Sequence, residues 1–225
     1  MKKNEILNLL YVAKDYSKLK KICLKNKGDE WYKSIYAKVL FNEQKYSDAA
    51  KIFYELKMFY ESGYCLLMLG DLFNAKRLWD SLDDSKPIYL WGKSMLGFIE
   101  KKPNQLPTYF QIRNFLEQDL DALLRANLIS FAENLINSID MLAQINSESY
   151  KYMARVLLNH NYYDISQNFL EQSKDIYYKD PETHFLLAKI YLQKHEIEKA
   201  KISLNNAIKV NDGYFPAKNL LNELN

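Results

Sequence analysis

The sequence predicts an all-α fold, a solenoid built from antiparallel helix pairs. Only 6 glycines and 5 prolines occur in 225 residues, against 18 tyrosines and 11 phenylalanines, so few residues interrupt long helices. A stripe of large, small and large side chains also returns along the chain, with centres at Ala132, Ser166 and Ala200 that are 34 residues apart. Self-similarity at such a period indicates a helical repeat.

Each stripe is centred on a small residue. Ile197 precedes Ala200 by three residues, Leu204 follows it by four and Ala207 by seven. This spacing places the side chains on one face of a helix, and the small side chain lets a neighbouring helix approach closely. Further centres with the same pattern are Ala49 and Ala75, with a weak copy at Leu19.

A second helix is expected before each of these stripes. This helix carries a large residue, a small residue directly after it, and a second large residue one turn later, as in Leu187, Ala188 and Tyr191. Equivalent sets begin at Met153 and Tyr36, and short polar turns separate the two helices of each pair. The repeating unit is therefore two antiparallel helices joined by a tight turn.

This pattern resembles the tetratricopeptide repeat (TPR) family. Residues 181–214 match best, although His184 stands at the family's tryptophan position and Asp212 at its closing proline. The resemblance implies a right-handed superhelical solenoid. We expect an N-terminal capping helix pair at 1–28, TPR-like repeats at 29–82 and 113–212, an irregular helical segment at 83–112 and a C-terminal capping helix at 213–225. The irregular segment should hold two helices, with its prolines able to kink it.

Residues for catalysis or metal binding are few. His184 and His195 are 11 residues apart, about 16 Å along a helix, too far to share one zinc ion. Asp119 and Asp121 lie two apart and do not face each other on a helix. The sequence also lacks a glycine-rich phosphate loop. We therefore expect no enzyme, no catalytic residue, no cofactor and no metal.

The two cysteines, Cys23 and Cys65, lie on apolar faces far apart in the sequence. They do not form a disulfide framework or a metal-binding set, and we expect both to be buried as small hydrophobic side chains. A reducing, cytoplasmic location fits this usage. No apolar run reaches the roughly 18 residues needed to span a membrane, and the first residues are interpreted as a helix and not as a signal peptide.

The TPR resemblance implies that the first helix of each pair lines a concave face that receives a partner. The residue after the small one points into that face, which gives Lys38, Arg155 and Lys189, with Lys151 and Phe185 one turn earlier. Basic side chains beside an aromatic one suit an acidic peptide or a terminal carboxylate. We expect a non-enzymatic scaffold or adaptor for a protein or peptide, while chance placement of surface lysines remains the alternative interpretation.

The N-terminal segment is strongly basic. Residues 1–27 contain eight lysines and two acids, a net charge of +6 in a chain whose total is +3. This favours either a solvated capping helix or contact with RNA, an acidic protein or a membrane surface. An RNA-binding helical repeat is the alternative function, although nucleic acid is the less expected partner because no basic position recurs in every repeat.

Overall fold

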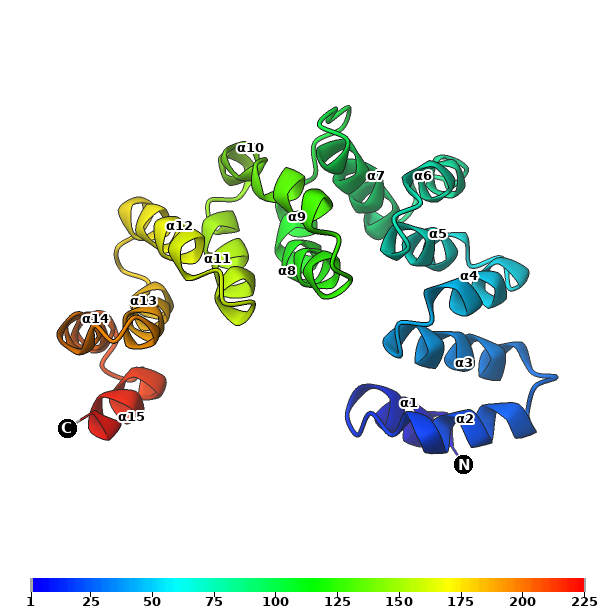
Figure 1. Ribbon diagram of the computed structural model, residues 1–225, viewed down its shortest axis with the longest axis horizontal. Helices are drawn as coiled ribbons and strands as arrows, with labels where there is room; N and C mark the ends of the chain where they lie inside the picture. The colour runs from blue at the N-terminus through cyan, green and yellow to red at the C-terminus, as the bar shows by residue number, and fades with distance from the viewer. Residues whose placement is uncertain (1, 225) are drawn as a thin grey trace. The chain divides into compact units, whose positions relative to one another are not determined.

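A computed structural model describes residues 2–224 of the chain (Figure 1). Across these residues, all regular structure is α-helical, in fifteen helices. The chain divides into two compact units, one of residues 1–105 and 125–128 and the other of residues 106–124 and 129–225. The predicted all-α, helix-pair fold class is confirmed, whereas the handedness of the superhelix stays a prediction.

In the first unit, successive helices pack against each other along the chain. Their bounds are α1 (Lys3–Tyr11), α2 (Tyr16–Lys25), α3 (Glu30–Asn42), α4 (Tyr46–Glu55), α5 (Phe59–Met68), α6 (Leu72–Asp80) and α7 (Pro87–Ile99). The pairs are α1 with α2, α3 with α4, and α5 with α6. Residues 83–112 contain α7 and only the first turn of the next helix.

The helices of the second unit are α8 (Tyr109–Arg125, with Arg125 grouped in the first unit), α9 (Ile129–Ile136), α10 (Ile139–Ile145), α11 (Ser149–Asn159), α12 (Tyr163–Ile176), α13 (Pro181–Gln193), α14 (Ile197–Val210) and α15 (Phe215–Glu223). In this unit, the helices from α10 to α15 pack successively in the same way as in the first. The stripe around Ala132 predicts that Ile139, seven residues later, lies on the same helix. This is wrong, because α9 ends at Ile136 and Ile139 starts the short helix α10.

The small residues at the stripe centres are buried, as predicted. Ala49, Ala75, Ser166 and Ala200 are 0% exposed and Ala132 is 1% exposed. Ser166 adds a polar contact, because its hydroxyl donates a 2.7 Å hydrogen bond to the backbone oxygen of Ala154 on the paired helix. Close approach between helices therefore depends on these positions throughout the chain.

The turns within the pairs share one backbone conformation. A single residue with positive φ follows the first helix, as in Gln44 (60°), Asn161 (66°) and His195 (59°). The residue after it donates its N–H five residues back, as from Glu196 to the oxygen of Tyr191 at 2.8 Å. This is the Schellman ending of a helix, which favours glycine at the positive-φ position. The repeat uses it even where the residue is not glycine.

Two glycines provide the same close approach around Trp79 in the first unit. The Trp79 ring stacks on Tyr60 at 5.0 Å, and its Nε1 donates to the Tyr60 backbone oxygen at 2.9 Å. A Cβ on Gly92 would lie 2.9 Å from the Tyr60 ring, and one on Gly63 would lie 2.4 Å from Trp79 Nε1. Only residues without a side chain fit against this stacked pair.

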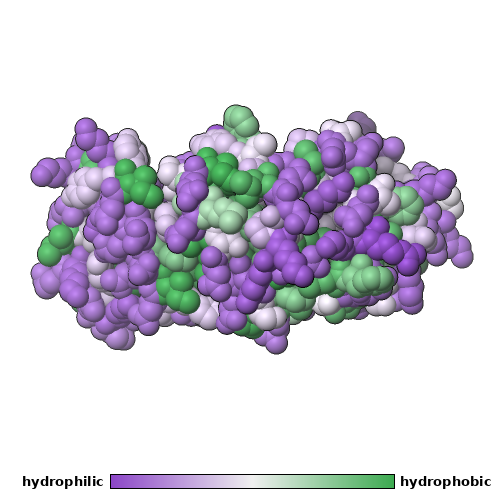
Figure 2. Space-filling model, turned by 90° about the horizontal axis from the view of Figure 1, so that it is seen from above, coloured by the Kyte–Doolittle hydropathy of each residue, from purple (hydrophilic) through white to green (hydrophobic). Residues whose placement is uncertain are grey.

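Several large apolar side chains remain exposed, among them Phe73 (75%) and Phe215 (69%). The space-filling view shows hydrophobic residues in separate patches between hydrophilic ones (Figure 2). Scattered exposure of this kind is common on soluble helical surfaces. The patches therefore do not by themselves mark a binding site.

Candidate functional site

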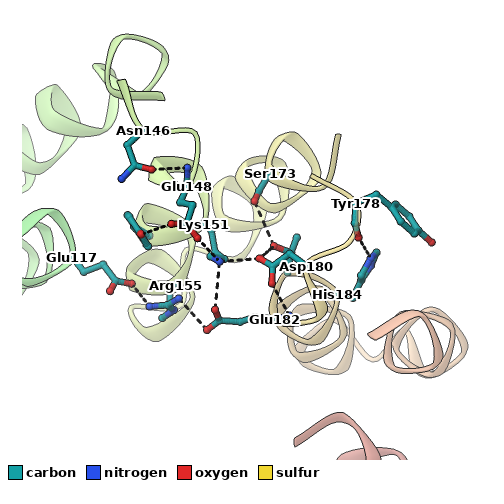
Figure 3. A network of polar contacts seen from close by, with 12 residues as sticks. Glu117, Asn146, Glu148, Lys151, Arg155, Ser173, Tyr178, Asp180, Glu182 and His184 are labelled. Carbon is teal, nitrogen blue, oxygen red and sulfur yellow. Dashed lines mark hydrogen bonds and ion pairs between the residues drawn. The ribbon is translucent and has the colours of Figure 1, made fainter. Parts of the chain in front are cut away.

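The candidate site lies in the second unit, on the side of α11 that faces α8 and α13. Lys151 and Arg155 are one helical turn apart on α11, so their side chains project from the same face. Both reach carboxylates on neighbouring elements, as the close-up view shows (Figure 3). The sequence predicted these two basic residues but not the acids that surround them.

Lys151 is buried among three carboxylates. Its Nζ lies 3.1 Å from Glu148, 2.8 Å from Asp180 and 3.6 Å from Glu182, and the residue is 8% exposed. Burial acts to lower the pKa of Lys151, but the hydrogen bonds and charges of Asp180 and Glu148 outweigh it and raise the pKa. Lys151 therefore stays charged and is compensated inside the protein.

Arg155 joins two other helices across the same face. Its guanidinium lies 2.7 Å from Glu117 on α8 and 2.9 Å from Glu182 on α13. Burial raises the pKa of Glu117, and the charge of Arg155 only partly opposes this. The two terminal nitrogens of the guanidinium hold one carboxylate each, and the buried Nε has no hydrogen-bond partner among residues 2–224.

Asp180 connects the network to the start of α13. As the N-cap residue, it accepts the Glu182 backbone N–H at 3.0 Å and the Thr183 hydroxyl at 2.8 Å. Burial acts to raise the pKa of Asp180, but the bonds from Lys151 and Thr183 outweigh it and lower the pKa. A carboxylate at this position satisfies the free N–H groups of the helix and the buried lysine together.

The network carries more negative than positive charge. Glu117, Glu148, Asp180 and Glu182 surround Lys151 and Arg155. The side chains of Glu148 and Glu182 are 42% and 36% exposed, whereas that of Lys151 is 10% exposed. The side chains of Arg155 and Glu117 are 31% and 30% exposed, so three carboxylates and one guanidinium meet solvent, and carboxylates predominate there.

The other three predicted site residues lie in different surroundings. Lys189 is exposed on α13, two turns beyond Glu182, and has no ion-pair partner among residues 2–224. Phe185 is half-buried and packs edge-to-face on Tyr214, with ring centroids 5.8 Å apart. Lys38 lies on α3 in the first unit, with its Nζ 3.4 Å from the Tyr11 hydroxyl. Of the four predicted residues in the second unit, Lys151 and Arg155 share the ion-pair network, and Phe185 and Lys189 do not.

Sequence reasoning missed Glu117 and Glu182. Glu182 could have been found from its spacing, because it precedes Phe185 by three residues and Lys189 by seven, which places all three on one face of a helix. Glu117 has no such signal, since its contact with Arg155 joins residues 38 apart in sequence. A second contact between residues far apart in sequence joins His160 Nε2 to Asp121 Oδ1 at 2.8 Å.

No family model matches the chain, and no curated protein matches it. Solved structures of TPR proteins are similar. YrrB, described as a TPR protein with an unusual peptide-binding site, is 15% identical, with 90% of this chain and 96% of YrrB covered and a TM-score of 0.37. TTC0263, a TPR protein of Thermus thermophilus, is 16% identical over 87% of this chain and 98% of its own, with a TM-score of 0.42.

A TPR protein of Parabacteroides merdae is 14% identical, covering 98% of this chain and 96% of its own with a TM-score of 0.40. At these scores the likenesses do not extend to partners or sites. The TPR-like description of this chain rests on its own helix pairs and buried small residues.

The described part of the chain has neither a membrane-spanning helix nor a metal-binding cluster. Among residues 2–224, no helix has the length and apolar character to cross a membrane. Over the same residues, His, Cys, Asp and Glu side chains nowhere gather in threes in a way that could hold a metal ion. Cys23 and Cys65 are both buried free thiols, as predicted.

Proposed function

We propose that the second unit binds an extended protein segment along the face formed by α8, α11 and α13, and that the chain is a non-enzymatic scaffold. The observation that carries the proposal is the row of charged side chains that meet across these three helices. Glu117, Arg155 and Glu182 come one from each helix and remain partly exposed. Helical repeats bind partners along surfaces of this kind, built from equivalent positions of successive units.

The charges on this face suggest how a partner would be oriented. The exposed carboxylates around Glu182 favour a Lys or Arg side chain, because a carboxylate of the partner would be repelled there. The sequence-based expectation of an acidic partner applies instead at Lys189, which is about 10 Å further along α13 at 1.5 Å per residue. The half-buried Phe185 lies between them and offers an apolar contact. A segment with a basic residue, an apolar residue and an acidic residue in that order matches this face.

A peptide array tests this orientation. We expect the wild-type protein to prefer peptides with a basic and an acidic residue separated by about three positions, the span of 10 Å in an extended chain. Glu182→Gln should remove the preference for the basic residue, and Lys189→Gln should remove the preference for the acidic one. Lys209→Gln, at an exposed site on α14, is the matched control and should change neither preference.

Affinity capture from a cell lysate, followed by mass spectrometry, tests the scaffold function itself. Proteins enriched by the wild type and lost with the Glu182→Gln, Lys189→Gln double variant would support the proposal. Circular dichroism should show that the double variant keeps its helical content. Equal capture by wild type and double variant would place the partner surface elsewhere and contradict the proposal.

A further inference from the structure

A second charged surface lies on α2, in the first unit. Lys18, Lys21 and Lys25 follow one another at spacings of three and four residues, and all three are exposed. We refer to them as the lysine face. Leu19 and Cys23, on the opposite side of the helix, are 0% and 3% exposed. The lysines therefore point straight away from the core of the unit over a length of about 10 Å.

The lysine face lies on a helix that is basic along its whole length and has an acid, Asp15, at its N-cap. The sequence of α2, YSKLKKICLK, contains four lysines and no acidic residue. Lys20 is turned toward the core side and pairs with Glu43, whereas Lys18, Lys21 and Lys25 have no ion-pair partner among the described residues. Lysines in the second unit are commonly paired, as Lys194 is with Asp164. Unpaired positive charges on one line form a surface that attracts an extended anion.

Exposed aliphatic side chains lie at both ends of α2. Val12, just before the helix, is 73% exposed, and Leu24, near its end, is 56% exposed. Nucleic-acid surfaces that bind single strands place aromatic rings beside their basic residues, so that bases can stack on them. Tyr11, next to Val12 in sequence, is 59% exposed, whereas Tyr16 packs against the core. One exposed ring does not make the row of rings on which successive bases stack. A tyrosine and aliphatic side chains near lysines suit a membrane surface, because they reach the boundary of the acyl chains while the lysines stay at the headgroups.

We propose that the lysine face docks the first unit on membranes that contain anionic phospholipids. The lysines would lie over the phosphate and carboxylate groups of the headgroups, and Val12 and Leu24 would make shallow apolar contact. Binding would be peripheral and reversible, and it would weaken as salt screens the charges. This docking is independent of the segment-binding face proposed for the second unit.

Sedimentation with vesicles tests the proposal. We expect the full chain to bind vesicles of phosphatidylcholine with about 30% phosphatidylserine at low salt, and to remain in solution with phosphatidylcholine alone. The triple variant Lys18→Gln, Lys21→Gln, Lys25→Gln should bind the anionic vesicles roughly 100-fold more weakly, because each lysine near such a surface contributes a factor of about five.

A matched control separates the lysine face from net charge. Lys57, Lys101 and Lys209 are exposed elsewhere on the chain, and changing all three to Gln removes the same charge. This control variant should keep most of the vesicle affinity. If it loses as much as the lysine-face variant, or if the wild type does not bind anionic vesicles at low salt, the proposal is overturned.

A labelled single-stranded oligouridine provides the nucleic-acid comparison. The double variant Val12→Asn, Leu24→Asn should weaken vesicle binding several-fold, because it removes the apolar contact and keeps the lysines. RNA binding that is tighter than vesicle binding and unaffected by this double variant would assign the lysine face to RNA and overturn the lipid proposal. Circular dichroism of every variant should retain the helical signal of the wild type.

Discussion

Gly63 lies directly against the indole of Trp79, so that a Cβ at Gly63 would be 2.4 Å from the ring nitrogen. The indole cannot move away easily, because it is fully buried and its Nε1 is hydrogen-bonded to the Tyr60 backbone. The helix pair α5 and α6 therefore meets at a glycine on α5 in addition to the buried Ala75 on α6. Close helix approach is the shared physical requirement.

Gly63→Ala should destabilise the protein. The added methyl group must displace the ring or separate the helices, and overpacking of this kind costs about 1–3 kcal/mol in the free energy of unfolding. Urea denaturation measured by far-ultraviolet circular dichroism would give the value. Gly28→Ala is the control, because a Cβ there has no neighbour within 4 Å, and it should change stability little. Equal stability of the two variants would contradict the close-approach argument.

Ala200→Leu should have a comparable effect in the second unit. Ala200 is 0% exposed between α13 and α14, and a leucine there would force the helices apart, at a cost of about 1–3 kcal/mol. Glu198→Leu, an exposed position on the same helix, serves as control for the added hydrophobic residue. The melting temperature of each variant checks the prediction, and an unchanged value for Ala200→Leu would refute it.

Ser166→Ala tests the contact between α11 and α12, in which the small residue also makes a hydrogen bond. The hydroxyl of Ser166 is buried and donates to the oxygen of Ala154, so its loss should lower the free energy of unfolding by about 0.5–1.5 kcal/mol. The cost should stay below that of Ala200→Leu, because alanine keeps the helix spacing. Ser17→Ala, at an exposed position on α2, should be nearly neutral. Chemical denaturation would rank the three variants, and a cost for Ser166→Ala no larger than that for Ser17→Ala would be inconsistent with the buried bond.

His195→Gly should stabilise the protein. His195 has a φ of 59° at the end of α13, a conformation that costs a residue with a side chain about 1 kcal/mol and that glycine adopts freely. Part of this gain is offset by the greater freedom of glycine in the unfolded chain, so we expect about 0.5 kcal/mol. The reverse change, Gly70→Ala at a φ of 80°, should destabilise. A rise in melting temperature for the first variant and a fall for the second would support the prediction, and a fall for both would contradict it.

The carboxylates around Lys151 predict a loss of stability in acid. The pKa values of Asp180 and Glu148 are lowered in the folded protein, because hydrogen bonds and the charge of Lys151 outweigh the effect of burial. Their stabilisation is complete above their unfolded values, near about pH 4, and is lost as the pH falls through the lower folded values. The pKa of Glu117 is raised in the folded protein, mainly by burial. Protonation of Glu117 in acid therefore favours the folded state and opposes the loss of stability.

Urea denaturation between about pH 6 and pH 2.5 measures this effect. We expect stability to fall below about pH 4. Lys151→Met should be less stable than the wild type at about pH 6, because it leaves the largely buried Asp180 carboxylate without its cation. Its stability should also depend less on pH in the acid range. An identical pH profile for wild type and Lys151→Met would show that these ion pairs do not cause the acid sensitivity.

The helix pairs and the residues at which they meet follow from the spacing of side chains along the chain. The spacing of Ala200 with Ile197 and Leu204 is a local property of a helix, and burial of a small residue follows from that spacing without knowledge of the neighbours. The turns at Asn161 and His195, 34 residues apart, belong to the same repeat. The basic character of α2 is also evident from consecutive residues.

Which charged side chains are left without a partner depends on how the helices pack. Lys151 and Arg155 have the sequence positions of partner-binding residues, but Glu117, Asp180 and Glu182 come from other helices or their caps and neutralise them. These contacts join residues 27 to 38 positions apart, a distance at which no helical periodicity relates one side chain to another. The electrostatic character of a surface depends on such pairings, which exist only once the helices have packed together.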